Sequence, residues 1–107
     1  MPITPMSEIM NMAQLVEYQT DAVVSRQIIK ATGGNVTLFA FDKNQELSEH
    51  TTPYDALVQV LDGQAKITIS GKPYLLQVGE GILMPAGQPH AVKAMTGLKM
   101  LLTMIKA

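Results

Sequence analysis

The sequence predicts an all-β protein, a single-domain jelly-roll-like β-barrel with a short N-terminal helix. From Val16 onward the chain consists of short β-branched or alternating apolar runs separated by turn residues, which is the pattern of closely spaced strands. A chain of 107 residues with 47% apolar residues has the size and composition of one domain with one hydrophobic core. Because so many strands cannot be buried as one open sheet in a small chain, we expect them to close into a barrel or a two-sheet sandwich.

The N-terminal helix is predicted over residues 7–14. Ser7 is a favourable N-cap residue and Glu8 lies in the first turn, where an acidic side chain is stabilising. Its apolar stripe consists of Ile9, Met10 and Ala13. We expect one domain over residues 1–107, in which 1–34 comprise this helix and a leading strand packing on the barrel, and 35–107 form the barrel itself.

Eight strands are predicted, with turn residues in most of the gaps. They span residues 22–29, 35–42, 56–61, 64–70, 73–78, 81–84, 90–95 and 98–105. Residues 32–35 separate the first pair, Asp62 and Gly63 suit a tight hairpin, and residues 70–73 form another turn. Glycines and prolines then crowd residues 79–89, where a helix could not persist.

The side-chain pattern of two strands indicates which faces are buried. In residues 64–70, Ala65, Ile67 and Ile69 alternate with polar residues and are expected to point inward. In the last strand Leu98, Met100, Leu102 and Met104 form one apolar face, but Leu101 and Ile105 make the other face apolar too. We therefore expect a homodimer through this outer face. The alternative is that another segment of the same chain, such as residues 7–14, covers it.

Composition excludes several classes of function. Eight basic and nine acidic residues are scattered singly, so no patch for nucleic acid or an anionic membrane is predicted. No apolar run approaches the roughly 20 residues of a membrane-spanning helix, and no targeting segment is predicted at the start. The absence of cysteine rules out disulfides and thiolate ligands and favours a cytoplasmic location. Neither a nucleophilic serine elbow nor a phosphate-binding glycine loop is found.

Residues 79–90, with the sequence GEGILMPAGQPH, carry a family resemblance. The spacing of Gly79, Pro85, Gly87 and His90 resembles the second motif of the cupin superfamily, although Ala94 replaces the asparagine that commonly closes it. The residues support the same geometry independently. A turn rich in glycine and proline leads into a strand at His90, and the period of two places His90 inside while Lys93 faces solvent.

The first cupin motif is only partly matched. Gly63 stands at its closing glycine and His50 at its first histidine. The positions of the opening glycine, the second histidine and the glutamate are occupied by Asn44, Thr52 and Ala56. The resemblance covers roughly residues 35–105 and implies a barrel whose mouth contains both histidines.

The resemblance implies a metal site, since cupins usually bind a metal through three histidines and one glutamate. Here only His50 and His90 remain as ligands, and two imidazoles alone are expected to hold a divalent metal such as Zn, Fe, Mn or Ni weakly. No cofactor is therefore firmly predicted. A bulge near residues 53–54 could turn Asp55 inward as a replacement carboxylate, and Glu46 or Glu49 could reach from the loop before the barrel strand.

The sequence therefore predicts a binding site for a small-molecule ligand, with no catalytic residue identified. The residues expected to line it are His50, Tyr54, Met84, His90 and Met100. Phe39 and Phe41 are interpreted as core or interface aromatics, and most methionines as core filler. The leading hypothesis is a cupin that binds a small, mostly apolar molecule; the alternatives are a metal-dependent dioxygenase or isomerase and a structural dimerisation module.

Overall fold

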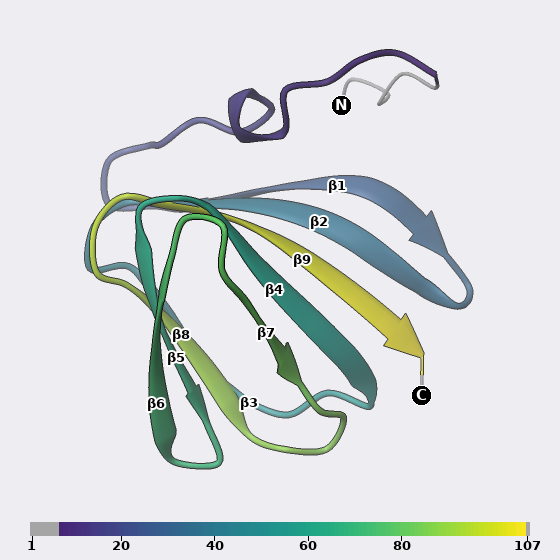
Figure 1. Cartoon of the computed structure of the whole chain (residues 1–107), viewed down its shortest axis with the longest axis vertical. Helices are drawn as coiled ribbons and strands as arrows, with labels where there is room; N and C mark the ends of the chain where they lie inside the picture. Colours follow the sequence, from purple (N-terminus) through teal and green to yellow (C-terminus); the bar gives the residue numbers. More distant parts are fainter. Residues whose placement is uncertain (1–6, 107) are drawn as a thin grey trace.

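The computed structural model describes residues 7–106, which form two antiparallel sheets facing each other (Figure 1). The five-stranded sheet has the order β1-β2-β9-β4-β7 and the four-stranded sheet the order β3-β8-β5-β6. The strands are β1 (Val23–Ala31), β2 (Gly34–Phe41), β3 (Glu46–His50), β4 (Tyr54–Asp62), β5 (Gln64–Ile69), β6 (Lys72–Gln77), β7 (Gly81–Met84), β8 (His90–Ala94) and β9 (Leu98–Lys106). The predicted all-β jelly-roll barrel is confirmed.

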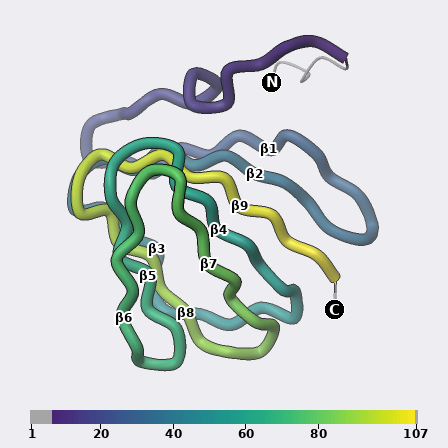
Figure 2. The backbone as a smooth tube through the Cα atoms, in the orientation of Figure 1, coloured from purple at the N-terminus to yellow at the C-terminus, as the bar shows by residue number. Residues whose placement is uncertain are grey.

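The two sheets are tied together at one end of the barrel by the turns that connect them. The backbone N–H of Gln64 donates to the Thr96 hydroxyl, and the N–H of Asn44 donates to the carbonyl of Ala94. At the opposite end the 85–89 loop is held by the 51–53 loop, because the N–H of Gly87 donates to the carbonyl of Thr52. Figure 2 traces the chain through these turns. We call the second end the mouth of the barrel.

The core lies between the two sheets, where alternate side chains of each strand meet. Its buried members are Phe41, Ala56, Val58, Val60, Ala65, Ile67, Ile69, Leu76, Met84, Val92, Ala94, Leu98 and Met100. The inward positions predicted in β5 are confirmed, because Ala65, Ile67 and Ile69 are all buried. Phe41 is fully buried and Phe39 packs against the same cluster, so both are core aromatics.

A second, smaller cluster lies on the outer face of the five-stranded sheet. Val16 is buried there against Leu38 and Ala40 of β2, and Leu101 of β9 packs on the same cluster. The N-terminal segment, residues 7–22, therefore covers part of this face within the same chain. The sequence left open whether the N-terminal segment or a second subunit covers the outer side of the last strand. The N-terminal segment covers Leu101.

The predicted N-terminal helix is wrong. Only Met12–Gln14 forms a helical turn, a 3-10 turn of three residues. Ser7 has a φ of 59°, in the left-handed region, whereas an N-cap residue is extended. An eight-residue helix gains few hydrogen bonds against the cost of nucleation. Within this segment Met12 packs on the sheet, whereas Ile9 of the predicted apolar stripe is fully exposed. No helix in residues 7–106 is both long and apolar enough to span a membrane.

Polar contacts fasten the N-terminal segment beside the 62–64 turn. The Tyr18 hydroxyl donates to the carboxylate of Asp62, and burial together with that carboxylate raises the pKa of Tyr18 above its usual range. The ammonium group of Lys99 donates to the carbonyl of Ala13 at 2.6 Å and lies 5.0 Å from the centre of the Tyr18 ring. These contacts join three segments that are distant in sequence.

Two further predictions of local structure need correction. The sequence missed β3, because it contains a single apolar residue, Leu47, and its alternation is interrupted. The turn at Asp62 and Gly63 is not a hairpin, since β4 and β5 belong to different sheets. The chain instead crosses there from one sheet to the other. In contrast, the turn within residues 70–73 is a two-residue hairpin turn, with Ser70 and Gly71 both at positive φ.

We predict that Gly63→Ala destabilises the protein much more than Gly71→Ala. Both glycines have a positive φ, at 77° and 82°, so each substitution adds a backbone strain of about 1–2 kcal/mol. A Cβ on Gly63 would also lie 1.8 Å from the carbonyl oxygen of Gly97, whereas a Cβ on Gly71 meets nothing within 4 Å. Urea unfolding should give losses of more than about 3 kcal/mol and about 1–2 kcal/mol, respectively. Equal losses would contradict the proposed contact.

Candidate functional site

One extra residue in β3 places His50 inside the barrel. Leu47 pairs with Val92 and His50 pairs with His90, so two residues of β3 lie opposite one residue of β8. This is a β-bulge, and a shift of one residue moves every following side chain to the other face of the sheet. In a regular strand Leu47 and His50 would point to opposite faces. The bulge gives both an inward position.

The two histidines meet at the barrel mouth, as predicted. The Nε2 atoms of His50 and His90 are 3.1 Å apart, and the ring centroids are separated by 4.3 Å in an edge-to-face arrangement. His90 is 4% exposed, while His50 is exposed on its mouth side. The predicted orientation of β8 is also confirmed, because Val92 and Ala94 are buried and Lys93 faces solvent.

Backbone carbonyls decide which nitrogen of each ring carries hydrogen. Nδ1 of His50 lies 2.7 Å from the carbonyl oxygen of Ser48, and Nδ1 of His90 lies 3.2 Å from that of Gln88. A carbonyl only accepts, so each Nδ1 is the donor and each neutral ring presents a lone pair at Nε2. Two lone pairs that face each other repel. The pair therefore favours a positively polarised group, a proton, an acidic hydrogen or a cation, between or beside the Nε2 atoms.

Burial lowers the pKa of His90 below the usual histidine range. The hydrogen bond to the carbonyl of Gln88 opposes this effect, and positive charge on His50 adds to it. Full protonation of both rings is disfavoured, because two imidazolium groups would then face each other at short range.

Three of the other positions singled out in the sequence lie on the five-stranded sheet toward the mouth. Tyr54 begins β4, and Ala56 pairs with Met84 of β7 on one side and with Met104 of β9 on the other. Met84 is buried, and Met104 packs on the edge of the core. Met104 was assigned only to the apolar face of the last strand. Its pairing with Ala56, at the position of the lost glutamate, could not be predicted without the strand register.

Met100 lies deeper in the barrel than these residues. It pairs with Val60 and Phe39, four residues along β9 from Met104, which corresponds to about 13 Å on a strand. It is 1% exposed and belongs to the packed core. Three surface cavities within residues 7–106 are lined by neither histidine. A molecule bound at the histidine pair would therefore lie across the mouth and not in one of these cavities.

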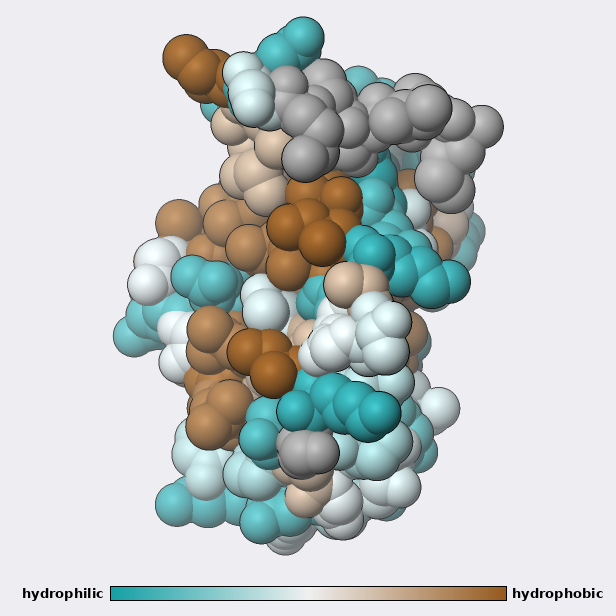
Figure 3. Space-filling view, turned by 90° about the vertical axis from the view of Figure 1, so that its right-hand side faces the viewer, coloured by the Kyte–Doolittle hydropathy of each residue, from teal (hydrophilic) through white to brown (hydrophobic). Residues whose placement is uncertain are grey.

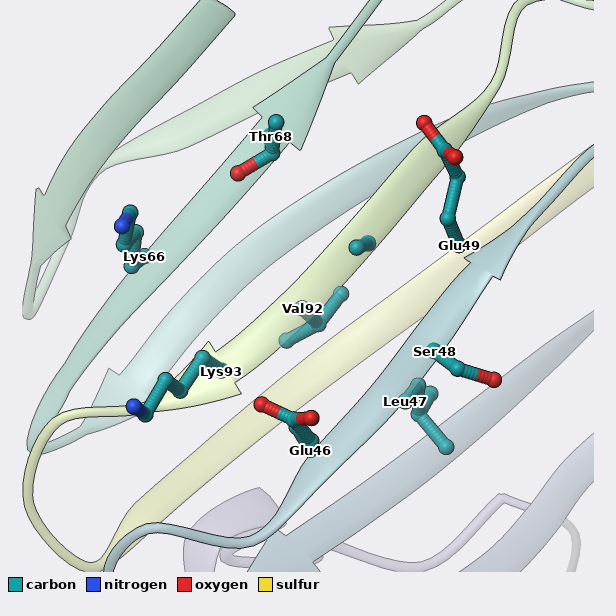
Figure 4. Close-up of a pocket in the computed structure, with 9 residues that line it drawn as sticks. Glu46, Leu47, Ser48, Glu49, Lys66, Thr68, Val92 and Lys93 are labelled. Carbon is teal, nitrogen blue, oxygen red and sulfur yellow. The ribbon is translucent and has the colours of Figure 1, made fainter. Parts of the chain in front are cut away.

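None of the three candidate carboxylates approaches the histidines. β4 pairs regularly with β9 at Tyr54 and Ala56, so Asp55 lies on the opposite face, where its carboxylate accepts from the N–H of Ala86 at 2.9 Å. Glu46 and Glu49 belong to β3 and line a groove of about 250 Å³ on the outer side of the four-stranded sheet. Figure 4 shows this groove, with both glutamates and with Lys66 and Lys93 from the neighbouring strands.

The donor set fits only half of a metal site. Two nitrogen ligands about 2.0–2.1 Å from one ion, in octahedral or tetrahedral geometry, lie about 2.9–3.4 Å apart, which the observed 3.1 Å satisfies. Thr52 and Ala56 supply no imidazole or carboxylate, however. Within residues 7–106 no group of three or more His, Cys, Asp or Glu residues is placed to hold an ion. The residues therefore do not fit a tightly held resident metal.

The arrangement of two sheets, a glycine- and proline-rich loop and a buried histidine at a strand start agrees with the sequence comparison. Residues 37–106 match the cupin domain. The chain belongs to the cupin family. This match spans all four strands of the small sheet and most of the large one, and both histidines of this cupin lie within it.

Several solved structures resemble this cupin closely. A protein of unknown function from Streptococcus pyogenes is 35% identical with a TM-score of 0.93, over 99% of this chain and 93% of that one. A cupin 2 conserved barrel domain protein from Leptotrichia buccalis is 42% identical with a TM-score of 0.88 over 91% of this chain, which spans 47% of that protein. A cupin superfamily protein from Desulfitobacterium hafniense shares the fold, at 24% identity and a TM-score of 0.92, over 99% of this chain and 97% of that one. No curated protein matches the chain.

We predict that this cupin loses stability as the pH falls below about 6.5. Because the pKa of folded His90 is lowered, the unfolded chain binds the proton more readily, and the free energy of unfolding decreases on acidification through this range. Urea unfolding between pH 8 and pH 5 measures the change. His90→Gln, which cannot titrate, should flatten the profile between pH 7 and pH 5.5; an unchanged profile would assign the loss to other groups.

Proposed function

We propose that this cupin binds a small, mostly apolar molecule across the barrel mouth, with His50 and His90 as its polar anchors. The observation that carries the proposal is the 3.1 Å separation of the two Nε2 atoms, both directed to one point while both Nδ1 atoms are occupied by backbone carbonyls. Such preorganisation of two acceptors costs stability unless a ligand group relieves their repulsion.

The chemistry of the pair indicates the polar group of the ligand. Two Nε2 lone pairs accept an acidic hydrogen, such as that of a phenol or a carboxylic acid, and the resulting charge-assisted hydrogen bond is stronger than a neutral one. Tyr54, Met84 and Met104 on the opposite sheet support an apolar body for the same molecule. A phenolic or carboxylic molecule of modest size satisfies both requirements. The lack of cysteine in the chain favours a cytoplasmic location for the protein.

A metal-dependent enzyme of the dioxygenase or isomerase type is the second candidate function. The observation that favours it is again the separation of the Nε2 atoms, which suits two ligands of one divalent ion. Its weakness is the donor set, because Thr52 and Ala56 leave the ion without the usual third imidazole and carboxylate. The third hypothesis, a structural dimerisation module, would leave the converging imidazoles without a role.

We predict that phenol, used as a probe, binds at the histidine pair. In a ¹H–¹³C NMR titration the ring signals of both His50 and His90 should shift together with those of Tyr54, and the shift of the Tyr54 ring signals should be lost in the His50→Ala, His90→Ala double variant. Thr68→Ala, on the outer face of β5, is the matched control and should leave them unchanged. Shifts that persist in the double variant would contradict the proposed anchors.

We predict weak metal binding, with dissociation constants above about 1 µM for Zn²⁺, Ni²⁺ and Mn²⁺ in equilibrium dialysis, since two imidazoles supply only half of a tetrahedral site. Each single histidine variant should lower binding at least tenfold. Stoichiometric uptake below 1 µM that depends on both histidines would instead favour the metal-dependent enzyme.

A further inference from the structure

The largest of the three surface cavities lies between the N-terminal segment and β1. It is lined by residues 14–17 and Gln19 of that segment and by residues 24–26 of β1. Its volume is about 420 Å³, against about 250 Å³ and about 210 Å³ for the other two. Ligand cavities in proteins usually measure about 300–1,000 Å³, so of the three only this one has the size of a small-molecule site. We call it the β1 cavity.

The N-terminal segment forms one wall of the β1 cavity, and contacts on both sides of the cavity hold that wall in place. Figure 1 shows the segment running above β1, and in the side view of Figure 3 it again lies at the top, with hydrophobic surface beneath it. Before the cavity, the carbonyl of Ala13 accepts from the ammonium group of Lys99. After it, the Tyr18 hydroxyl donates to Asp62. A wall that is already fixed spares a ligand the cost of ordering it.

The floor of the β1 cavity is apolar. Val16 is 3% exposed and is buried in the smaller core cluster on the outer face of the sheet. Leu15 and Val24 are half-buried and pack on the same cluster. An apolar group placed in the cavity would therefore extend an existing cluster and would be removed from water in doing so.

Arg26 brings a positive charge to the wall formed by β1. It is half-buried, and within residues 7–106 its guanidinium donates one hydrogen bond, from an Nη atom to the carbonyl of Leu15. The bond is long, at 3.5 Å, whereas such bonds usually measure about 2.7–3.2 Å. A guanidinium has five N–H donors in a planar fork that matches a carboxylate. Donors of Arg26 are therefore available to a ligand in the cavity.

The charges on the walls select the class of ligand. A molecule that covers the half-buried guanidinium of Arg26 removes water from it and has to supply an acceptor in exchange, preferably a negatively charged one. Glu17 lines the same cavity, so a phosphate dianion would be repelled more strongly than a carboxylate with a single charge. The walls and the floor together favour a carboxylate that carries an apolar body.

We propose that the β1 cavity is a second binding site, for a small carboxylate whose charged group pairs with Arg26 and whose apolar chain lies on Leu15 and Val24. The site is separate from the histidine pair. Neither histidine lines the cavity, and Tyr18 fastens its wall to Asp62 at the end of the barrel opposite the mouth. The inference is therefore independent of the proposed function.

A titration of the full chain with hexanoate, followed by ¹H–¹⁵N NMR, tests the site. The backbone amide signals of residues 15–17 and 24–26 should shift to saturation, with a dissociation constant of about 1 mM or lower. Hexanamide, which has the same length but no charge, should bind at least tenfold more weakly. Arg26→Gln should weaken hexanoate binding at least tenfold. Lys30→Gln is the matched control, because Lys30 is an exposed cation on the same strand outside the cavity, and it should leave the dissociation constant unchanged.

The same titration in the His50→Ala, His90→Ala double variant separates this site from the mouth. The shifts near Arg26 should persist there with the same dissociation constant, and their loss would overturn the inference. Equal binding of hexanoate and hexanamide, equal effects of Arg26→Gln and Lys30→Gln, or no saturation by about 10 mM hexanoate would also overturn it. The comparison with hexanamide uses the wild-type chain, so the test does not depend on the folding of any variant.

Discussion

The pairing of β3 with β8 sets the position of the histidines on which the candidate site depends. One extra residue between Leu47 and His50 changes the face that His50 occupies, and the hydrogen bond from its Nδ1 to the carbonyl of Ser48 uses a backbone group within that bulge. His90 needs no such device, because it begins a regular strand whose alternate residues are buried. An edge strand with a bulge thus places an exposed imidazole against a buried one.

The converging imidazoles stand in a barrel whose other metal-ligand positions contain no ligand. Thr52 and Ala56 occupy the positions at which cupins usually have a histidine and a glutamate, and Asp55, Glu46 and Glu49 point elsewhere or act in other contacts. Loss of the carboxylate removes negative charge from the mouth, so the pair is left to bind through lone pairs alone. Two imidazole lone pairs without a carboxylate suit a binding site for an acidic hydrogen better than a tight metal centre.

The outer face of the large sheet is covered only in part within residues 7–106. Near the 62–64 turn the N-terminal segment packs over Leu38, Ala40 and Leu101, fastened by Tyr18 and Lys99. Farther along the same face of β9, Thr103 is half-buried and Ile105 is 60% exposed.

The sequence by itself determined the all-β class, eight of the nine strands of residues 7–106 to within two residues at each end, and the inward direction of His90. These features follow from local periodicity and turn residues. It did not determine β3, the crossing at Gly63, the fate of residues 7–14, or the position of Met104 beside Ala56. Those depend on register and on contacts between segments far apart in the chain.

Residues 7–14 have a helical pattern, but packing on the sheet prevails over weak local propensity. Likewise, only the tertiary structure reveals that the bulge aligns His50 with His90, because an extra residue in a strand leaves no signal until its partner strand is known.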